Sequence, residues 1–483
     1  MAITSNYTPT AAPSKQTLAS AYIDFTAGGV GQTNGWAQQY LPDLMAKEAE
    51  VFGKRTIGGF LEQVGAEEAM ASDQVVWSEQ SRLHLSYTVT VGGTGTTLTV
   101  THDADGTSVA DATTHGIRAG DMVILADANS TVKAYVTAIN SGVATVQPYN
   151  FDHLNTAGIG NVSGVKCLVF GSEYAKGNTG RTEVNEPKFK SYTNKPIILK
   201  DKYEISGSDA SQIGWVEVSG EEGQGGFMWY LKAEGDTRAR FSDYLEMAMI
   251  ESVKATGDGL TDLAAASPGT HGGAITGTEG LFAAIEARGN ETTGITGVNA
   301  ATDLAEFDAI LAEFDKNGAI EENMMFVNRA TALAMDDMLA SMNSYGAGGT
   351  SYGVFDNSED MALNLGFSGF RRGSYDFYKS DWKYLNDKST RGLINEMDTV
   401  NAIRGVMVPA GVSSVYDENL GKNLKRPFLH VRYRASQTES RKYKTWTTGS
   451  VGAVTSDLDA MEMHFLSERC LVVQGANNFM LMN

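Results

Sequence analysis

Cysteine, proline and long apolar runs are all scarce in this sequence. Its 483 residues include two cysteines and nine prolines. Cys167 and Cys470 lie in the apolar runs VKCLVF and ERCLVVQ, which predicts buried free thiols rather than a disulfide framework or a zinc site. No stretch approaches the roughly 18 apolar residues of a membrane span, and the N-terminal residues do not pair a basic segment with an apolar one. We therefore expect a soluble protein made in a reducing cytoplasm.

Basic residues are outnumbered by acidic ones. The net charge of −20 argues against a dedicated DNA-binding protein, which normally carries a basic patch. The same charge suits a protein that lies beside nucleic acid without adhering to it. With 42% hydrophobic and 20% charged residues, the chain is expected to be globular, and its length suffices for about two to four domains.

Sequence motifs for catalysis are missing. The chain has no G-x-S-x-G elbow, no P-loop and no H-E-x-x-H pair, and the glycine-rich run GGVGQTNG follows no strand. Asp103 and Asp105 precede Gly106 but lack the further oxygen ligands of a calcium loop, so a polar turn is expected there. We expect no catalytic residues, no metal and no cofactor, although missing motifs do not exclude an enzyme with a β-barrel insert.

The stretch from 226 to 255 has the clearest helical period and predicts one long helix. Its apolar face is expected to carry Phe241, Tyr244, Leu245, Ala248, Met249 and Ser252. Its polar face is expected to carry Arg240, Asp243, Glu246 and Glu251. A continuous helix of this length would extend about 45 Å, and Gly235 near its middle would permit a bend.

The composition changes between about 85 and 170. Thr and Val alternate around glycines, as in TVTVGGTGTTLTVTHD, and the segment predicts five or six short strands. Closely spaced strands without a helical period indicate a small β-barrel or sandwich, inserted into the rest of the chain. The flanking segments, about 74–86 and 186–206, are expected to pair as the two sides of one long hairpin.

Helices and strands alternate after residue 280. A short helix is expected at LFAAIEA and a longer one at 303–317, where Asp303 with Glu306 forms a capping-box pattern and Asn317 with Gly318 marks the end. The strand MMFVN precedes the helix ATALAMDDMLASM, and the C-terminal part alternates as strands.

Two segments concentrate basic charge. The first carries Lys188, Lys190, Lys195, Lys200 and Lys202. It predicts either an edge strand protected by lysines or an arm that contacts an acidic patch on a neighbour. In the second, 425–444, alternation places His430, Arg432 and Arg434 on one strand face. Pairing of that face with acidic neighbours is favoured over a nucleic-acid groove, given the net charge.

This order of parts resembles that of the major capsid proteins of tailed bacteriophages, the Hong Kong 97-like fold. The similar stretches are MMFVNRATALAMDDMLASM, GFRRGSYDFYKS, IRGVMVPAG and the closing HFLSERCLVVQGANNFMLM. The stretch from EYAKGN to KYEISGS is similar to the return strand of the hairpin in members with an inserted β-domain. The resemblance covers nearly the whole chain by order of elements, while its individual motifs are weak.

The resemblance implies an α+β capsid fold with an N-terminal arm, an extended E-loop hairpin, a long spine helix, peripheral and axial domains and a small all-β insertion. The corresponding ranges are 1–52 for the arm, 53–85 and 186–214 for the hairpin, 86–170 for the inserted β-barrel or sandwich, 215–258 and 416–483 for the peripheral domain, and 259–415 for the axial domain.

The resemblance also implies a non-enzymatic function, self-assembly through pentamers and hexamers into an icosahedral shell. The shell would enclose double-stranded DNA without sequence-specific binding, and scaffolding, portal and decoration proteins are further partners that it allows, with no membrane. Assembly would occur in the host bacterial cytoplasm, and the product would be part of the virion.

Contacts between subunits are expected from the low-charge arm at 1–36, the lysine arm at 188–202, Arg432 and Arg434. Some members of the family cross-link Lys to Asn between subunits. Asn194 lies in the lysine arm, but the sequence identifies no catalytic Glu, so no cross-link is expected.

Two alternatives remain beside an enzyme with a barrel insert. An encapsulin-like shell that houses an enzyme keeps the fold but is disfavoured by the inserted β-module and the long N-terminal arm. A secreted or tail-associated β-rich adhesin is disfavoured by the missing signal peptide and the well-patterned helices.

Replacing residues 86–170 with a short linker should leave soluble protein with native-like helix content, because the segment is expected to be an inserted module. Circular dichroism of the shortened chain measures this. Wholesale unfolding would show instead that the segment belongs to the core.

Overall fold

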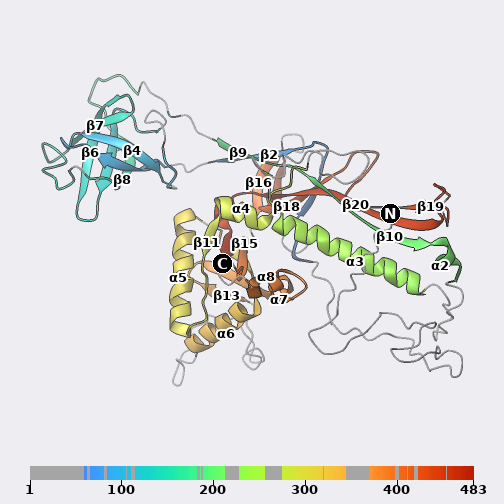
Figure 1. The fold of residues 1–483 in the computed structure, drawn as a ribbon. Coiled ribbons are helices and arrows are strands. Elements are labelled where there is room, and N and C mark those ends of the chain that lie inside the picture. The colour runs from blue at the N-terminus through green and yellow to red at the C-terminus, as the bar shows by residue number, and fades with distance from the viewer. Residues whose placement is uncertain are drawn as a thin grey trace. The chain divides into compact units, whose positions relative to one another are not determined.

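A computed structural model gives the fold in two compact units (Figure 1). It describes residues 59–61, 66–80, 84–104, 106–109, 115–160, 162–181, 185, 189–212, 228–255, 275–318, 320–343, 369–397, 402–410, 412–417, 422–452 and 454–483. The N-terminal arm expected at 1–52 and Lys188 lie outside these residues. The first unit comprises residues up to 63 with 198–248 and 437–468, and the second comprises 64–197, 249–436 and 469–483.

The first unit is built around helix α3 (Met228–Glu251), which corresponds to the helix expected at 226–255. Phe241 and Leu245 of α3 pack with Phe465 in an aromatic core. The ring of Phe241 lies 5.4 Å from that of Tyr443 and 5.9 Å from that of Phe465. These partners come from the start of strand β20 (Ala460–Val473) and from the loop before β19 (Lys444–Gly449), which pairs antiparallel with β20.

The two faces of α3 agree only partly with the helical period. Phe241, Leu245 and Met249 are buried as expected, whereas Tyr244 is 47% exposed. Glu246, expected on the polar face, is buried with 8% exposure. The period therefore identified the helix and most of its core, but it placed a tyrosine and a carboxylate on the wrong sides.

Glu246 is buried because it binds the backbone of a distant segment. Its Oε1 accepts hydrogen bonds from the N–H groups of Phe60 (2.7 Å) and Leu61 (3.2 Å), and its Oε2 accepts one from Gly59 (3.1 Å). Burial raises the pKa of this carboxyl group, an effect that the three hydrogen bonds oppose. Backbone donors leave no signature in side-chain periodicity, so the contact could not be read from the sequence.

The second unit contains a six-stranded mixed sheet in the order β11–β21–β15–β12–β14–β13. Its strands are β11 (Asn290–Thr292), β12 (Glu322–Val327), β13 (Gly369–Arg372), β14 (Tyr375–Asp381), β15 (Gly405–Pro409) and β21 (Met480–Met482). The central β12 pairs parallel to β14 and antiparallel to β15. The expected strand MMFVN is thus confirmed at the centre of a sheet, which explains its continuous apolar run.

Helices α5 (Ala300–Asn317) and α6 (Arg329–Asn343) pack with this sheet (Figure 1). Phe307 and Phe314 of α5 and Met335 of α6 are fully buried with Met325 and Phe377 of the sheet. The helix expected at 303–317 is confirmed as α5. The structure also has shorter helices: α2 (Gly207–Gln212), α4 (Leu281–Arg288), α7 (Lys383–Asn386), α8 (Arg391–Met397) and the 3-10 turn η4 (Ala476–Asn478).

The start of α5 differs from the expected capping box. Asn299 caps the helix about one turn earlier and accepts the N–H of Thr302 at 3.0 Å. Asp303 and Glu306 instead accept N–H groups from the preceding loop, at 2.9 and 2.8 Å. The end is as expected, because Gly318 is left-handed with φ 64°.

The expected long hairpin forms as a shorter two-stranded ribbon. Strand β2 (Val75–Gln80) pairs antiparallel with β9 (Phe189–Asn194), with Val75 opposite Asn194. The remainder of the expected return strand, β10 (Ile197–Ser206), lies beside β20 instead. Pro196 separates the two strands, and because proline has no N–H it cannot continue a ladder.

The module expected at 86–170 is a closed barrel of six strands in the order β3–β4–β7–β6–β5–β8. The strands are β3 (Ser86–Val91), β4 (Thr97–Asp103), β5 (Asp121–Ala126), β6 (Thr131–Asn140), β7 (Val143–Pro148) and β8 (Val165–Ser172). Inward residues of all six strands form one core that includes Val89, Leu98 and Leu125. Asp121 is buried and pairs with Arg181 at 3.0 Å, so the chain after the barrel is tied back to it.

Replacing Glu246 with Ala should destabilise the first unit by about 2–4 kcal/mol, because three backbone N–H groups lose their acceptor. Hydrogen–deuterium exchange of the peptide that contains Gly59–Leu61 measures the lost protection. Glu246→Gln is the graded control, since its remaining oxygen can keep two of the bonds and should retain most of the protection. Unchanged exchange in Glu246→Ala would contradict this role.

Candidate contact surfaces

The base of the β2–β9 ribbon is fixed in the second unit by a buried amide. Asn194, with no exposed surface, donates from Nδ2 to the carbonyl oxygens of Glu279 (3.0 Å) and Leu471 (2.7 Å). Its Oδ1 accepts the N–H of Glu279 at 2.9 Å and the hydroxyl of Thr278 at 3.1 Å. Leaving any of these buried donors or acceptors unpaired would cost free energy. The side-chain amide of Asn194, the last residue of β9, is therefore held in one orientation.

A cation–aromatic stack supports the same end of the ribbon. The guanidinium of Arg288 lies 4.4 Å from the ring centre of Tyr192 on β9 and 5.6 Å from that of Trp77 on β2. Arg288 also pairs with Glu279 at 2.9 Å, so the stack and the Asn194 network share one segment. Such contacts are worth about 0.5–2 kcal/mol each.

Two further contacts hold the ribbon. Lys254 Nζ donates to the carbonyl oxygen of Thr193 at 2.7 Å. Glu79 of β2 accepts the indole N–H of Trp77 and the backbone N–H of Gly475, both at 3.0 Å. The Lys254–Thr193 and Glu79–Gly475 contacts left no signal in the sequence, because each joins distant residues and uses a backbone atom on one side.

The expected lysine contact arm is divided between different surroundings. Lys190 lies over the ring of Tyr192 at 5.4 Å, and Lys195 and Lys200 are exposed. Lys202 pairs with Glu204 (3.0 Å) and Glu462 (2.8 Å), which raises its pKa. Among the described lysines of this arm, Lys190, Lys195 and Lys200 therefore present their charge most openly.

Arg432 and Arg434 find acidic partners within the chain. They lie on β18 (Leu429–Arg434), which is parallel to β1 (Ala66–Met70) and antiparallel to the end of β20. Arg432 pairs with Glu68 at 2.7 Å, and Arg434 pairs with Asp73. The interpretation of this strand as one that pairs with acidic neighbours is consistent with these contacts. His430, expected on the same exposed face, is instead buried.

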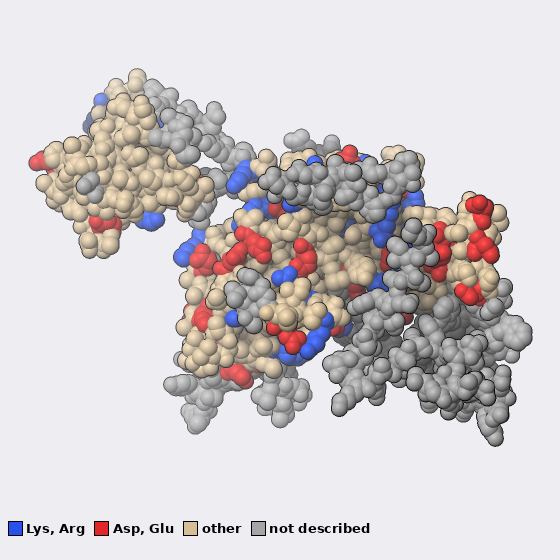
Figure 2. Space-filling model, viewed as in Figure 1, with Lys and Arg blue, Asp and Glu red and all other residues tan. Residues whose placement is uncertain are grey.

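Charged side chains of both signs are interspersed over the viewed face (Figure 2).

One partly buried cluster joins Glu251 to Tyr384 and Arg391, each 2.6 Å away. Burial and the hydrogen bond to Glu251 raise the pKa of Tyr384, so its hydroxyl remains a donor. The cluster ties the end of α3 to α7 and α8 and offers no nucleophile.

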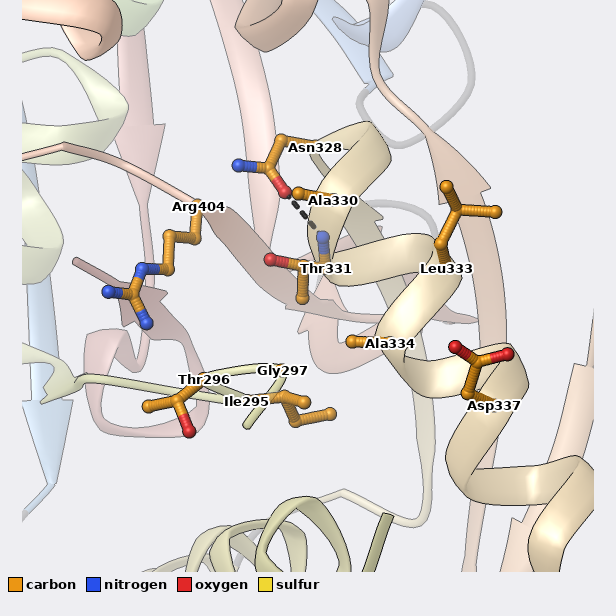
Figure 3. A pocket seen from close by; sticks show the side chains of 10 residues that line it. All are labelled: Ile295, Thr296, Gly297, Asn328, Ala330, Thr331, Leu333, Ala334, Asp337 and Arg404. Atoms are coloured by element: carbon orange, nitrogen blue, oxygen red, sulfur yellow. Dashed lines mark hydrogen bonds between the residues drawn. The ribbon is translucent and has the colours of Figure 1, made fainter. Parts of the chain in front are cut away.

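A hollow of about 420 Å³ lies beside the start of α6 (Figure 3). Asn328 caps α6 by accepting the N–H of Thr331 at 2.8 Å, and Arg404 donates to the carbonyl oxygen of Thr293 at 3.1 Å. Asn328 and Arg404, two of the polar residues that line the hollow, thus stabilise the fold. Across the residues that the structure describes, no group of three His, Cys, Asp or Glu is placed to hold a metal ion. No helix in that part of the chain is long and apolar enough to cross a membrane.

No protein-family model and no curated protein matches the sequence. The structure is similar to solved phage structures over about nine-tenths of the chain. One from Mycobacterium phage Ogopogo is 11% identical, with a TM-score of 0.40, and the match covers 91% of this chain and 96% of that one. The mature capsid of bacteriophage PhiM1 is 8% identical, with a TM-score of 0.40 and 93% of each chain covered. The capsid of cyanophage P-SCSP1u is 9% identical, with a TM-score of 0.39 and 93% and 94% covered.

Replacing Asn194 with Ala should lower the stability of the second unit by about 2–4 kcal/mol and release the base of the ribbon. The readouts are thermal unfolding and hydrogen exchange of the β9 amides. Ser191→Ala, at an exposed position of the same strand, is the matched control and should leave both unchanged. If the two variants behave alike, Asn194 does not anchor the ribbon.

Proposed function

We propose that this chain is a major capsid protein that self-assembles into an icosahedral shell around a phage genome. The observation that carries the proposal is the β2–β9 ribbon. Among the described residues these two strands pair only with each other, and the inserted barrel lies in the chain between them. A ribbon with two open edges is marginal by itself, and neighbouring subunits offer it further contacts.

The order of elements supports the same proposal. The ribbon is followed by the long helix α3, by the mixed sheet with α5 and α6, and by the returning strand β20. The capsid family resembled by the sequence has the same order of hairpin, spine helix, axial domain and closing strands. On this proposal the ribbon belongs to the E-loop, α3 is the spine helix, and α5 and α6 belong to the axial domain.

The charge pattern suits a container for DNA. The chain carries a net charge of −20, and Arg432 and Arg434 are paired with carboxylates of the same chain. A lining of this kind would enclose double-stranded DNA without binding its sequence. Pentamers and hexamers of the chain would form the shell, with scaffolding, portal and decoration proteins as further partners and the virion as the final location.

Contacts between subunits would add many small contributions. Lys190, Lys195, Lys200 and Lys202 are the described lysines of the proposed contact arm, and exposed Val76 and Ile198 lie in the adjoining strands. Interfaces of this kind gain strength from the number of simultaneous contacts rather than from any single one.

The purified chain should form closed shells, or rings of five and six subunits, seen by light scattering and negative-stain microscopy. Asn194→Ala should assemble less, because its ribbon is loosened at the base. Enclosed DNA would support the capsid role, whereas enclosed protein would favour an encapsulin-like container. A chain that stays monomeric at 51.7 kDa with crowding agents would contradict self-assembly.

A further inference from the structure

The outer face of the barrel is chemically uneven. On β3 and the first part of β4 the outward residues bear hydroxyl groups, and β4 ends in the exposed His102 and Asp103. The hydroxyl-bearing residues are Ser86, Thr88, Thr90, Thr97, Thr99 and Thr101. On β5 and β8 the outward residues are mostly apolar: Met122, Ile124, Ala126, Leu168 and Phe170. Leu168 and Phe170 are 42% and 43% exposed. A closed barrel with a filled core does not need apolar residues on its outside, so this side is suited to a contact.

Strand register joins these residues into one patch. Ile124 lies opposite Leu168 across β5 and β8, and Met122 lies opposite Tyr135 across β5 and β6. Phe170 is at the bulge where the β5–β8 register shifts. The methyl group of Met122 occupies the space that a side chain at position 171, a glycine, would need. We call Met122, Ile124, Tyr135, Leu168 and Phe170 the barrel patch.

The barrel patch has opposite charges at its two ends. Lys133 and Lys166, the only lysines between 86 and 172, flank one end, opposite Ile124 and Ala126 in the register. Exposed Glu173 follows the other end and accepts the hydroxyl of Tyr149 at 2.8 Å. In Figure 2 the side of the barrel that faces the viewer carries few charges.

We propose that the barrel patch is a contact between two copies of this chain, related by a twofold axis that passes between Leu168 and Phe170. Lys166 and Glu173 lie on either side of this axis at similar distances along the strand. The twofold therefore brings Lys166 of one copy to Glu173 of the other, twice. Such self-complementarity is what an isologous interface requires. This contact rests on the proposed function only because self-assembly supplies the second copy of the chain.

Disulfide trapping of the full chain tests the contact. Leu168→Cys should form disulfide-linked dimers under mild oxidation, because the two copies of this residue meet near the axis. Thr99→Cys, exposed on the hydroxyl-bearing side, is the matched control and should stay unlinked. The native thiols should not interfere, since Cys167 and Cys470 are buried and burial raises the pKa of each to about 12. Absence of dimers at position 168, or equal dimers at both positions, would overturn the proposal.

A charge exchange tests the twofold arrangement. In the Leu168→Cys chain, Lys166→Glu should reduce the dimer yield by about fivefold, because two attractive pairs become repulsive. Adding Glu173→Lys to the same chain should restore the yield. A double variant as weak as the single one would refute the pairing of these two residues.

The outcome is separable from that of the proposed function. Shells that form without a cross-link at position 168 would refute the barrel contact and leave self-assembly intact. Specific dimers through position 168 in a chain that forms no shells would establish the contact and refute the capsid role.

Discussion

The side-chain amide of Asn194 is the constraint on which the second unit depends most. It makes five hydrogen bonds, to Lys195, Thr278, Glu279 and Leu471, which join three distant segments of the chain. An amide buried in this way cannot rotate without leaving donors and acceptors unpaired, at about 1–3 kcal/mol for each. The end of β9 is therefore fixed, and through the β2–β9 ladder the start of β2 is fixed with it.

A fixed base matters because no further strand lies beside the ribbon among the described residues. The guanidinium of Arg288 lies over the rings of Tyr192 and Trp77 near the base. The outer edges of both strands have no partner strand among the described residues. Open edges are an aggregation hazard in a monomer, and in an ordered assembly they are places where neighbours can bind. The lysines of β9 and β10 would then limit which neighbours are accepted, since charge on an edge discourages unspecific pairing.

Local patterns predicted the elements well. The period of two around 86–170 predicted a small β-barrel or sandwich, which is a six-stranded barrel in the structure. The period of 3.6 located α3, α5 and α6. The failures at Glu246 and His430 share one physical cause, which is that both depend on partners far away in the sequence. Glu246 appeared polar but binds the backbone of Gly59, Phe60 and Leu61, and His430 appeared exposed but is covered in the fold. The roles of Asn194 and Arg288 were not predicted for the same reason.

On the proposed function, the ribbon contacts other copies of the chain. A cryo-electron-microscopy reconstruction of the particles formed by the purified chain tests it most directly, at a resolution that traces β2 and β9. We expect both strands to contact a neighbouring subunit, with Asn194 still hydrogen-bonded to Glu279 and Leu471 of its own chain. A reconstruction in which the ribbon touches only its own chain would contradict it.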